Sequence, residues 1–197
     1  KRAIVIGADQ ISSFVDWNDR RSCILFGDGA GALAIEATSE FDNFIGFDMR
    51  TDGDRGSFLN LPSKNNRDSI IGNIDFLSGD FSTIKMNGQE VYKFAVREVP
   101  IILEELFRKT NYSSDQVDWL LLHQANQRIL DSVGERLKIP REKILSNLEK
   151  YGNTSAATIP LMMDEAVRDC RIKQNDIIAT SGFGAGLSWG AALIKWG

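Results

Sequence analysis

The pattern of apolar and polar residues divides the chain into a β-rich first third and a longer part in which strands and helices alternate. Short apolar runs bounded by Gly, Asp or Asn occupy residues 3–7, 23–26 and 31–36, which is typical of buried strands. Residues 47–82 are instead rich in Asp, Gly, Asn and Ser. That composition predicts a loop-rich connection, and we place the main internal boundary there.

Beyond this connection, apolar residues recur at the three-to-four spacing of amphipathic helices. The elements expected there are a helix from about 88 to 109, a strand at 117–122, helices at 126–137 and 155–171, and strands at 177–181 and 188–195. Pro140 closes the second helix, and Thr154 or Ser155 is available to cap the third. The order of elements predicts an α/β fold.

Composition narrows the class of protein. The 197 residues are 43% hydrophobic, enough to bury a substantial core, and no run approaches the roughly 20 apolar residues of a membrane span. Residues 1–6 read directly as a strand, so we expect neither a signal peptide nor a membrane anchor, and the cytoplasm is the default compartment. The net charge of −4 argues weakly against nucleic acid as a partner. Cys23 and Cys170 lie far apart, which indicates neither a disulfide framework nor a zinc site.

His123, the only histidine, stands where a buried strand ends and a helix is about to begin. Reactive groups gather at such strand ends in open α/β sheets, and imidazole exchanges protons near neutral pH. A histidine hydrogen-bonded to backbone at the sheet edge would leave the same pattern. Asn153 lies between a glycine and small residues before a helix, where it could donate an amide hydrogen bond or simply cap the turn.

Two glycine-rich turns, at 26–31 and 183–186, follow strands without a clear helix or a Lys-Ser/Thr pair behind them, so they are poor nucleotide loops. Glycine there would allow close approach of two backbones, or present N–H groups to a substrate oxygen. A tight hairpin is an equally good interpretation of either turn.

Read together, FGDGAGA at 26–32, HQANQRI at 123–129, YGNTSAA at 151–157 and FGAGLSWG at 183–190 resemble β-ketoacyl-acyl-carrier-protein synthase III, in order and spacing, over essentially the whole chain. The resemblance implies a thiolase-like fold of helix, sheet, helix, sheet and helix layers. Residues 1–50 would be the last strands of the N-terminal half, 51–82 the connection and 83–197 the C-terminal half. The family's nucleophilic cysteine would precede residue 1, since Cys23 in a strand and Cys170 at a helix end are better explained as small core residues.

The resemblance also implies a reaction, the decarboxylative Claisen condensation of a short acyl-coenzyme A, acetyl-CoA being the expected one, with malonyl-acyl-carrier protein. His123 and Asn153 would be the catalytic pair that stabilises the enolate with N–H donors, which requires a neutral imidazole. Backbone at Ala185 and Gly186 would form part of a second oxyanion site. Many relatives have glycine in place of Ala185, and we expect the alanine to be tolerated. No metal or redox cofactor is implied, because the coenzyme A thioester is a substrate.

Further positions follow from the same resemblance. Those expected along the coenzyme A channel are Arg20, Gly88, Gln89, Tyr92, Ala125 and Asn126, the last of which would hold a water. Those expected to dock the acidic carrier protein are Arg128, Lys93, Arg97 and Arg136, with Arg128 the first choice. Local positive charge can steer an acidic partner despite the net charge. A homodimer is the usual state of this family.

Two alternatives remain at this point. The chain could be a non-catalytic half-domain that binds acyl carriers or pairs with another chain, although the retained His123 and Asn153 argue against a degenerate relative. It could also belong to a related synthase that acts on polyketide or quinolone precursors.

Overall fold

A mixed sheet of four strands forms the centre of the structure, a computed structural model that describes residues 1–37, 43–63, 67–71, 74–77 and 81–197. The strands lie in the order β3 (Phe44–Thr51), β10 (Ser188–Lys195), β9 (Ile177–Gly184) and β8 (Trp119–Leu122). Strand β8 runs parallel to β9, and the other neighbours are antiparallel. The strands at 188–195 and 177–181 predicted from the sequence are therefore confirmed, with β9 extended to Gly184.

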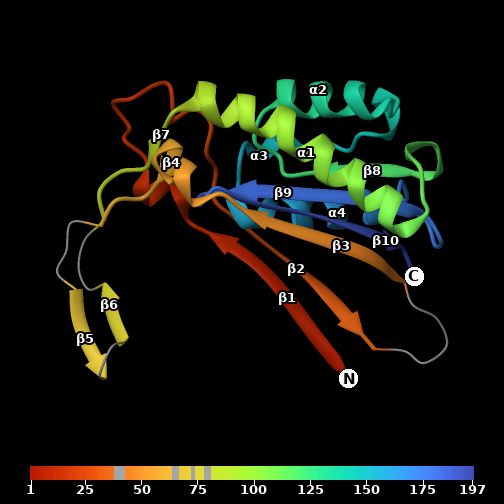
Figure 1. The fold of residues 1–197 in the computed structure, drawn as a ribbon, viewed down its shortest axis with the longest axis horizontal. Coiled ribbons are helices and arrows are strands. Elements are labelled where there is room, and N and C mark those ends of the chain that lie inside the picture. The colour runs from red at the N-terminus through yellow and green to blue at the C-terminus, as the bar shows by residue number, and fades with distance from the viewer. Residues whose placement is uncertain (38–42, 64–66, 72–73, 78–80) are drawn as a thin grey trace.

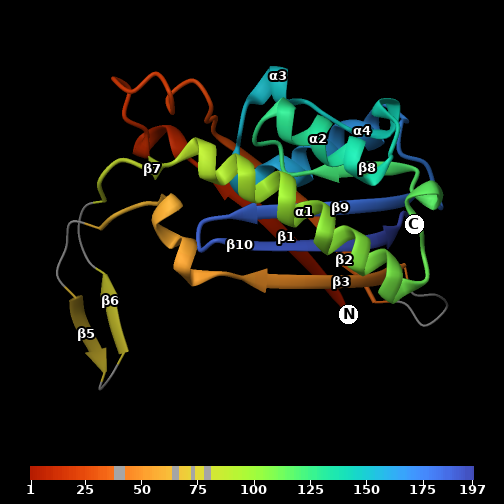
Figure 2. The same cartoon turned by 45° about the horizontal axis from the view of Figure 1, so that its top comes forward.

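Helices cover both faces of this sheet (Figures 1 and 2). Helices α1 (Gly88–Thr110) and α2 (Gln127–Leu137) lie on one face, where side chains such as Ile102, Leu106 and Leu130 are fully buried. Helix α4 (Thr158–Arg168) lies on the other face and packs Met162 and Met163 against Leu121 and Ile178. The apolar spacing that predicted the helices therefore corresponds to these two buried interfaces.

A second layer of strands lies beyond α4. Strands β1 (Arg2–Asp9) and β2 (Gly29–Glu36) form an antiparallel pair, and β2 contacts α4. The order of layers is thus helix, sheet, helix, sheet (Figure 1). Within the part of the chain that the structure describes, no helix combines the length and the apolar character needed to cross a membrane.

Short elements make up the rest of the described chain. They are η1 (Ile11–Phe14), η2 (Gly53–Phe58), β4 (Leu59–Asn60), β5 (Arg67–Ile71), β6 (Ile74–Leu77), β7 (Lys85–Met86), η3 (Ser114–Gln116), η4 (Arg141–Lys143), α3 (Leu148–Tyr151) and η5 (Ser155–Ala157). Strands β5 and β6 pair as a hairpin that stands apart from the layers in both views (Figures 1 and 2).

Glycines allow the β1–β2 pair to approach the backbone of residues 151–161 closely. A Cβ at Gly27 would lie 2.2 Å from the carbonyl oxygen of Tyr151, and one at Gly31 would lie 2.9 Å from Cβ of Pro160. Gly7, the cross-strand partner of Gly31, would meet the carbonyl oxygen of Ala156 at 2.1 Å. The first interpretation of the 26–31 glycines, close approach of two backbones, is therefore the one that the structure supports.

The strand predicted at 23–26 is wrong. Residues 19–25 form successive turns, in which Asp19 accepts from the backbone of Ser22 and Cys23, and only Phe26 forms an isolated bridge, to Asn153. The Asp19 carboxylate also accepts from the Arg21 backbone, so local side-chain bonding competes with strand formation. Cys23 is half-buried in this turn rather than in a strand, and Cys170 is exposed. Neither cysteine is therefore the small core residue that the sequence predicts.

Two other details differ from the expected elements. The third helix ends at Arg168 rather than 171, because Cys170 takes a left-handed conformation (φ 56°) and the N–H of Arg171 turns back to the carbonyl of Ala166. No side chain caps its start, so the cap expected from Thr154 or Ser155 does not form.

The stretch 47–82 is not all connection. Its first residues, 47–51, belong to strand β3, which pairs with β10 of the central sheet. Residues 44–50, which the sequence predicts to belong to the N-terminal half, therefore lie in the same sheet as the C-terminal strands. Residues 64–66, 72–73 and 78–80 of the expected connection lie outside the described residues.

Candidate active site

A cavity of about 510 Å³ opens where the end of β8, the β9–β10 turn, the start of α1 and the segment from Asn153 to α4 meet. Its lining is mostly apolar, with few polar side chains, as is common in small-molecule sites. Both residues that the sequence singled out, His123 and Asn153, line it. The fold therefore brings together two side chains that lie 30 positions apart in the sequence.

His123 follows the last residue of β8 and is fixed on three sides. Its backbone N–H donates to the carbonyl of Ser181 (2.8 Å), which continues the β8–β9 ladder. Its ring meets Phe183 edge to face, with centroids 5.2 Å apart, and its Nδ1 lies 2.6 Å from Oγ1 of Thr158. Burial among these groups disfavours the imidazolium and lowers the pKa of His123 from 6.5 to about 4. The imidazole is therefore neutral at physiological pH.

Asn153 is held by its backbone and by one end of its amide. Its N–H donates to the carbonyl of Leu25 (2.8 Å), and its carbonyl accepts from Gly27 (2.9 Å). Its Oδ1 accepts from the N–H of Ser155 (2.9 Å), which is the capping role considered from the sequence. Because the oxygen is committed in this way, Nδ2 remains a donor, and it forms no hydrogen bond with a described residue. The capping and donor roles are therefore compatible.

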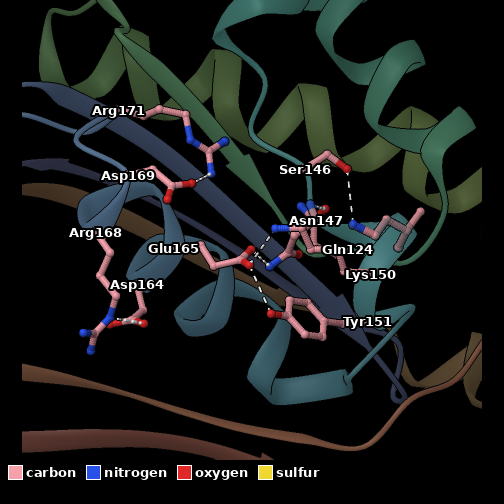
Figure 3. A network of polar contacts seen from close by, with 11 residues as sticks. Gln124, Ser146, Asn147, Lys150, Tyr151, Asp164, Glu165, Arg168, Asp169 and Arg171 are labelled. Atoms are coloured by element: carbon pink, nitrogen blue, oxygen red, sulfur yellow. Dashed lines mark hydrogen bonds and ion pairs between the residues drawn. The ribbon is translucent and has the colours of Figure 1, made fainter.

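A carboxylate on α4 anchors the segment that leads to Asn153 (Figure 3). Glu165 accepts from Nδ2 of Asn147 (2.7 Å), Nζ of Lys150 (3.0 Å) and Oη of Tyr151 (3.1 Å). Burial alone would raise the pKa of Glu165, but these three bonds outweigh it and hold that pKa below its usual value. An ionised Glu165 thus ties residues 147–151 to the helix.

Gln124 supports the same segment from the other side. Its side chain is fully buried, its Nε2 donates to the carbonyls of Leu122 (2.7 Å) and Leu145 (3.3 Å), and its Oε1 accepts from the N–H of Asn147 (3.3 Å). A buried amide satisfied on both ends fixes the loops that it joins. Gln124 therefore links the strand that carries His123 to the segment that carries Asn153.

The turn between β9 and β10 places backbone groups at the cavity. Ala185 lines it and has no positive φ, whereas Gly186, with φ +143°, adopts the conformation that needs glycine. The alanine is therefore tolerated, as expected from the sequence. The peptide bond between Gly186 and Leu187 is cis.

The residues predicted for the channel divide into two groups. Gly88, Tyr92, Ala125 and Asn126 line the cavity, and the Oδ1 of Asn126 caps α2 by accepting from the N–H two residues on (2.9 Å). Arg20 and Gln89 are exposed and outside the lining. The cavity thus contains four of the six predicted positions.

The predicted docking cations differ in their electrostatic surroundings. Lys93 is paired with Glu90 (2.7 Å), and Arg97 lies 3.4 Å from Glu98. Arg128 instead lies over the ring of Tyr92, 5.1 Å from its centroid, and neither it nor Arg136 forms an ion pair with a described residue. Both arginines therefore present a positive charge on α2 that no described acid balances, and Arg128 does so next to Tyr92 of the cavity lining.

Two residues of the site carried no functional signal in the sequence. Thr158 is buried, 2% exposed, at the start of α4, and a threonine near a helix start is read as part of a turn. Glu165 lies in an amphipathic helix, where a carboxylate is read as solvated surface. Thr158 and Glu165 could have been identified only from the fold, combined with their position after the YGNTSAA motif at 151–157.

Comparisons with known proteins agree with this geometry. Two family profiles match, 3-oxoacyl-[acyl-carrier-protein] synthase III over residues 1–53 and its C-terminal counterpart over residues 107–196. A curated β-ketoacyl-[acyl-carrier-protein] synthase III of Prochlorococcus marinus (strain MIT 9312) is 89% identical over all 197 residues. The chain spans 59% of the length of that relative.

Solved structures extend the agreement to the fold. The 3-oxoacyl-[acyl-carrier-protein] synthase III of Aquifex aeolicus VF5 (36% identity, TM-score 0.87) and the β-ketoacyl-[acyl-carrier-protein] synthase III of Thermus thermophilus (37% identity, TM-score 0.88) match 100% of this chain. The match covers 58% and 59% of those chains. The expected thiolase-like α/β fold is confirmed by these structures.

Proposed function

Because the chain belongs to the 3-oxoacyl-[acyl-carrier-protein] synthase III family, we propose that it supplies the enolate-stabilising part of an acyltransferase that starts fatty-acid chains. The substrates are a short acyl-coenzyme A, acetyl-CoA in the first instance, and malonyl-acyl-carrier protein, and the product is 3-oxoacyl-acyl-carrier protein. No metal or redox cofactor takes part in this scheme. The observation that carries the proposal is a neutral His123 in the same cavity as Nδ2 of Asn153, a donor that forms no hydrogen bond with a residue in the described part of the chain.

The proposed reaction has two stages. A cysteine thiolate attacks the acyl thioester and coenzyme A leaves as its thiol. The malonyl group on the carrier protein then loses carbon dioxide, and the resulting enolate carbon attacks the acyl carbonyl, which forms the new carbon–carbon bond and releases the cysteine. Negative charge develops on the thioester oxygen as carbon dioxide departs, and N–H donors from His123 and Asn153 stabilise it. Backbone at Ala185 and Gly186 forms part of a second oxyanion site, which stabilises the oxygen of the tetrahedral intermediate at the cysteine.

The nucleophile is proposed to lie in the part of the relatives' length that this chain does not match. Neither Cys23 nor Cys170 lines the cavity, which supports that assignment. We further propose a homodimer in the cytoplasm, or in a plastid stroma. The high identity to a relative named synthase III favours fatty-acid synthesis over the polyketide and quinolone alternatives.

The experiment is a chimera in which this chain replaces the 197 matching residues of the Prochlorococcus marinus relative. We expect it to condense acetyl-CoA with malonyl-acyl-carrier protein, and to lose condensation on His123→Ala or Asn153→Ala without losing the folded state by circular dichroism. A folded chimera without condensation would contradict the proposal and favour the non-catalytic half-domain.

Carrier-protein docking is tested through the contrast among the cations. We propose that Arg128 contributes most. The charges of Lys93 and Arg97 are balanced by neighbouring acids, and Arg128 lies over Tyr92 of the cavity lining, whereas Arg136 lies in the last turn of α2. Arg128→Glu should raise the KM for malonyl-acyl-carrier protein by about tenfold at low salt, with little change for acetyl-CoA. Arg108→Glu, exposed at the far end of α1, is the matched control. Equal effects of the two changes would show a nonspecific charge effect.

A further inference from the structure

The contact between His123 and Thr158 determines what the imidazole can do in the cavity. A neutral imidazole carries one proton, on either Nδ1 or Nε2, and the nitrogen without it is an acceptor. Nδ1 lies 2.6 Å from Oγ1 of Thr158, whereas Nε2 forms no hydrogen bond with a described residue. The partner of Nδ1 therefore sets whether Nε2 presents an N–H or a lone pair to a ligand.

The Thr158 hydroxyl has a single proton and two possible acceptors. One is Nδ1 of His123 at 2.6 Å, and the other is the carbonyl oxygen of Ser155 at 3.0 Å. If the hydroxyl donates its proton to the Ser155 carbonyl, Nδ1 must carry the imidazole proton and donate it to the hydroxyl oxygen, and Nε2 then has only a lone pair. If the hydroxyl donates its proton to Nδ1, the imidazole proton is on Nε2.

The two distances favour the second arrangement. The contact with Nδ1 is 2.6 Å long and the contact with the Ser155 carbonyl oxygen is 3.0 Å long, so Nδ1 is the nearer acceptor. An imidazole nitrogen is also more basic than an amide carbonyl oxygen, and the hydroxyl proton therefore goes to Nδ1. The Ser155 carbonyl already accepts the backbone N–H of Thr158, so it does not depend on the hydroxyl.

We propose that Thr158 is a positioning residue that donates its hydroxyl proton to Nδ1 of His123 and thereby fixes the tautomer with the proton on Nε2. This inference rests on the proposed function, because enolate stabilisation needs a donor at Nε2. The other tautomer would point a lone pair at the developing negative charge. Thr158 is 2% exposed, so solvent does not readily replace its hydroxyl.

The test measures the tautomer directly, by ¹⁵N NMR of histidine-labelled chimera, with the His123 signals identified by their loss in His123→Gln. We expect the proton on Nε2 in the unmodified protein and in Thr158→Ser, which keeps the hydroxyl. In Thr158→Val, which has the same shape without it, the proton should redistribute toward Nδ1. Malonyl decarboxylation should slow about tenfold in Thr158→Val, with acyl transfer from acetyl-CoA slowed less than twofold, and Thr158→Ser should restore the rate.

A proton on Nδ1 in the unmodified protein would overturn the inference, whatever the activity. An unchanged tautomer in Thr158→Val would overturn it as well, and if that variant does not fold, Thr158→Ala, which also lacks the hydroxyl, takes its place in the comparison. A chimera with the proton on Nε2 but without condensation would contradict the proposed function and leave the hydrogen bond standing.

Discussion

Burial of His123 should make the stability of the fold depend on pH between about 4 and 6.5. In the unfolded chain the imidazole takes up a proton as the pH falls below 6.5, whereas in the folded chain its pKa is about 4. Between these values the unfolded state binds more protons, so the free energy of unfolding decreases as the pH falls. Above pH 6.5 the imidazole is neutral in both states and the folded protein keeps its full stability.

The magnitude follows from the gap between the two pKa values. A gap of about 2.5 pH units, at about 1.4 kcal/mol for each, amounts to about 3 kcal/mol lost by pH 4. That loss is a large fraction of the total stability of an ordinary domain. Substitution of His123 by Gln removes this titration, because the amide stays neutral at every pH.

Urea unfolding of the chimera and of its His123→Gln variant, each at pH 7.5 and pH 4.5, measures the effect. Carboxylates and any other histidines titrate in both proteins, so their contributions cancel in the difference. We expect the unmodified protein to lose about 2–3 kcal/mol more than the variant between the two pH values. Parallel losses within about 0.5 kcal/mol would refute the argument that burial suppresses the charge on His123.

Three further changes test the support of the site, each by thermal or urea unfolding of the chimera. Gly27→Ala places a Cβ 2.2 Å from the backbone oxygen of Tyr151, and we expect a loss of about 1–3 kcal/mol together with reduced condensation. Gly134→Ala meets the tip of the Ile144 side chain at the same distance, but that tip can rotate away and alanine favours the helix, so the change should stay within about 1 kcal/mol. Glu165→Gln weakens three hydrogen bonds to a charged acceptor and should cost about 1–3 kcal/mol at pH 7. That cost should shrink as the pH falls and the carboxylate protonates, and a pH-independent cost would contradict the role of its charge.

The elements that the sequence predicted well are those whose burial follows a regular period. Helix α1 and strand β10 were placed to within a residue because one face of each is buried along its length. The strand at 23–26 failed because a four-residue apolar run carries no period, and the Asp19 carboxylate organises a turn there. The sequence predicts residues 47–51 of strand β3 as connection because Asp48 and Arg50 add to the polar composition of the stretch. In the structure these two side chains are partly buried and form ion pairs with Lys109 and Glu105 of α1, whereas the neighbouring apolar Phe47 and Met49 are exposed.

The candidate site divides in the same way. His123 and Asn153 could be named from the sequence because they lie in motifs with recognisable neighbours. Thr158 could not, because its role depends on a 2.6 Å contact across 35 residues that only the packing of α4 against β8 creates. Arg20 and Gln89 were placed by resemblance alone, and the structure leaves both outside the cavity lining.

The glycines that face residues 151–161 also bear on how the cavity can be reshaped. Gly7, Gly27 and Gly31 present only hydrogen atoms to residues 151–161, so at these three positions the spacing of the segments that carry Asn153 is set by close backbone contact. Redesign of the pocket by enlarging its lining side chains would leave that spacing intact. A methyl group at one of these glycines would instead push on the backbone of residues 151–161, so the shape of the cavity should also depend on positions outside its lining.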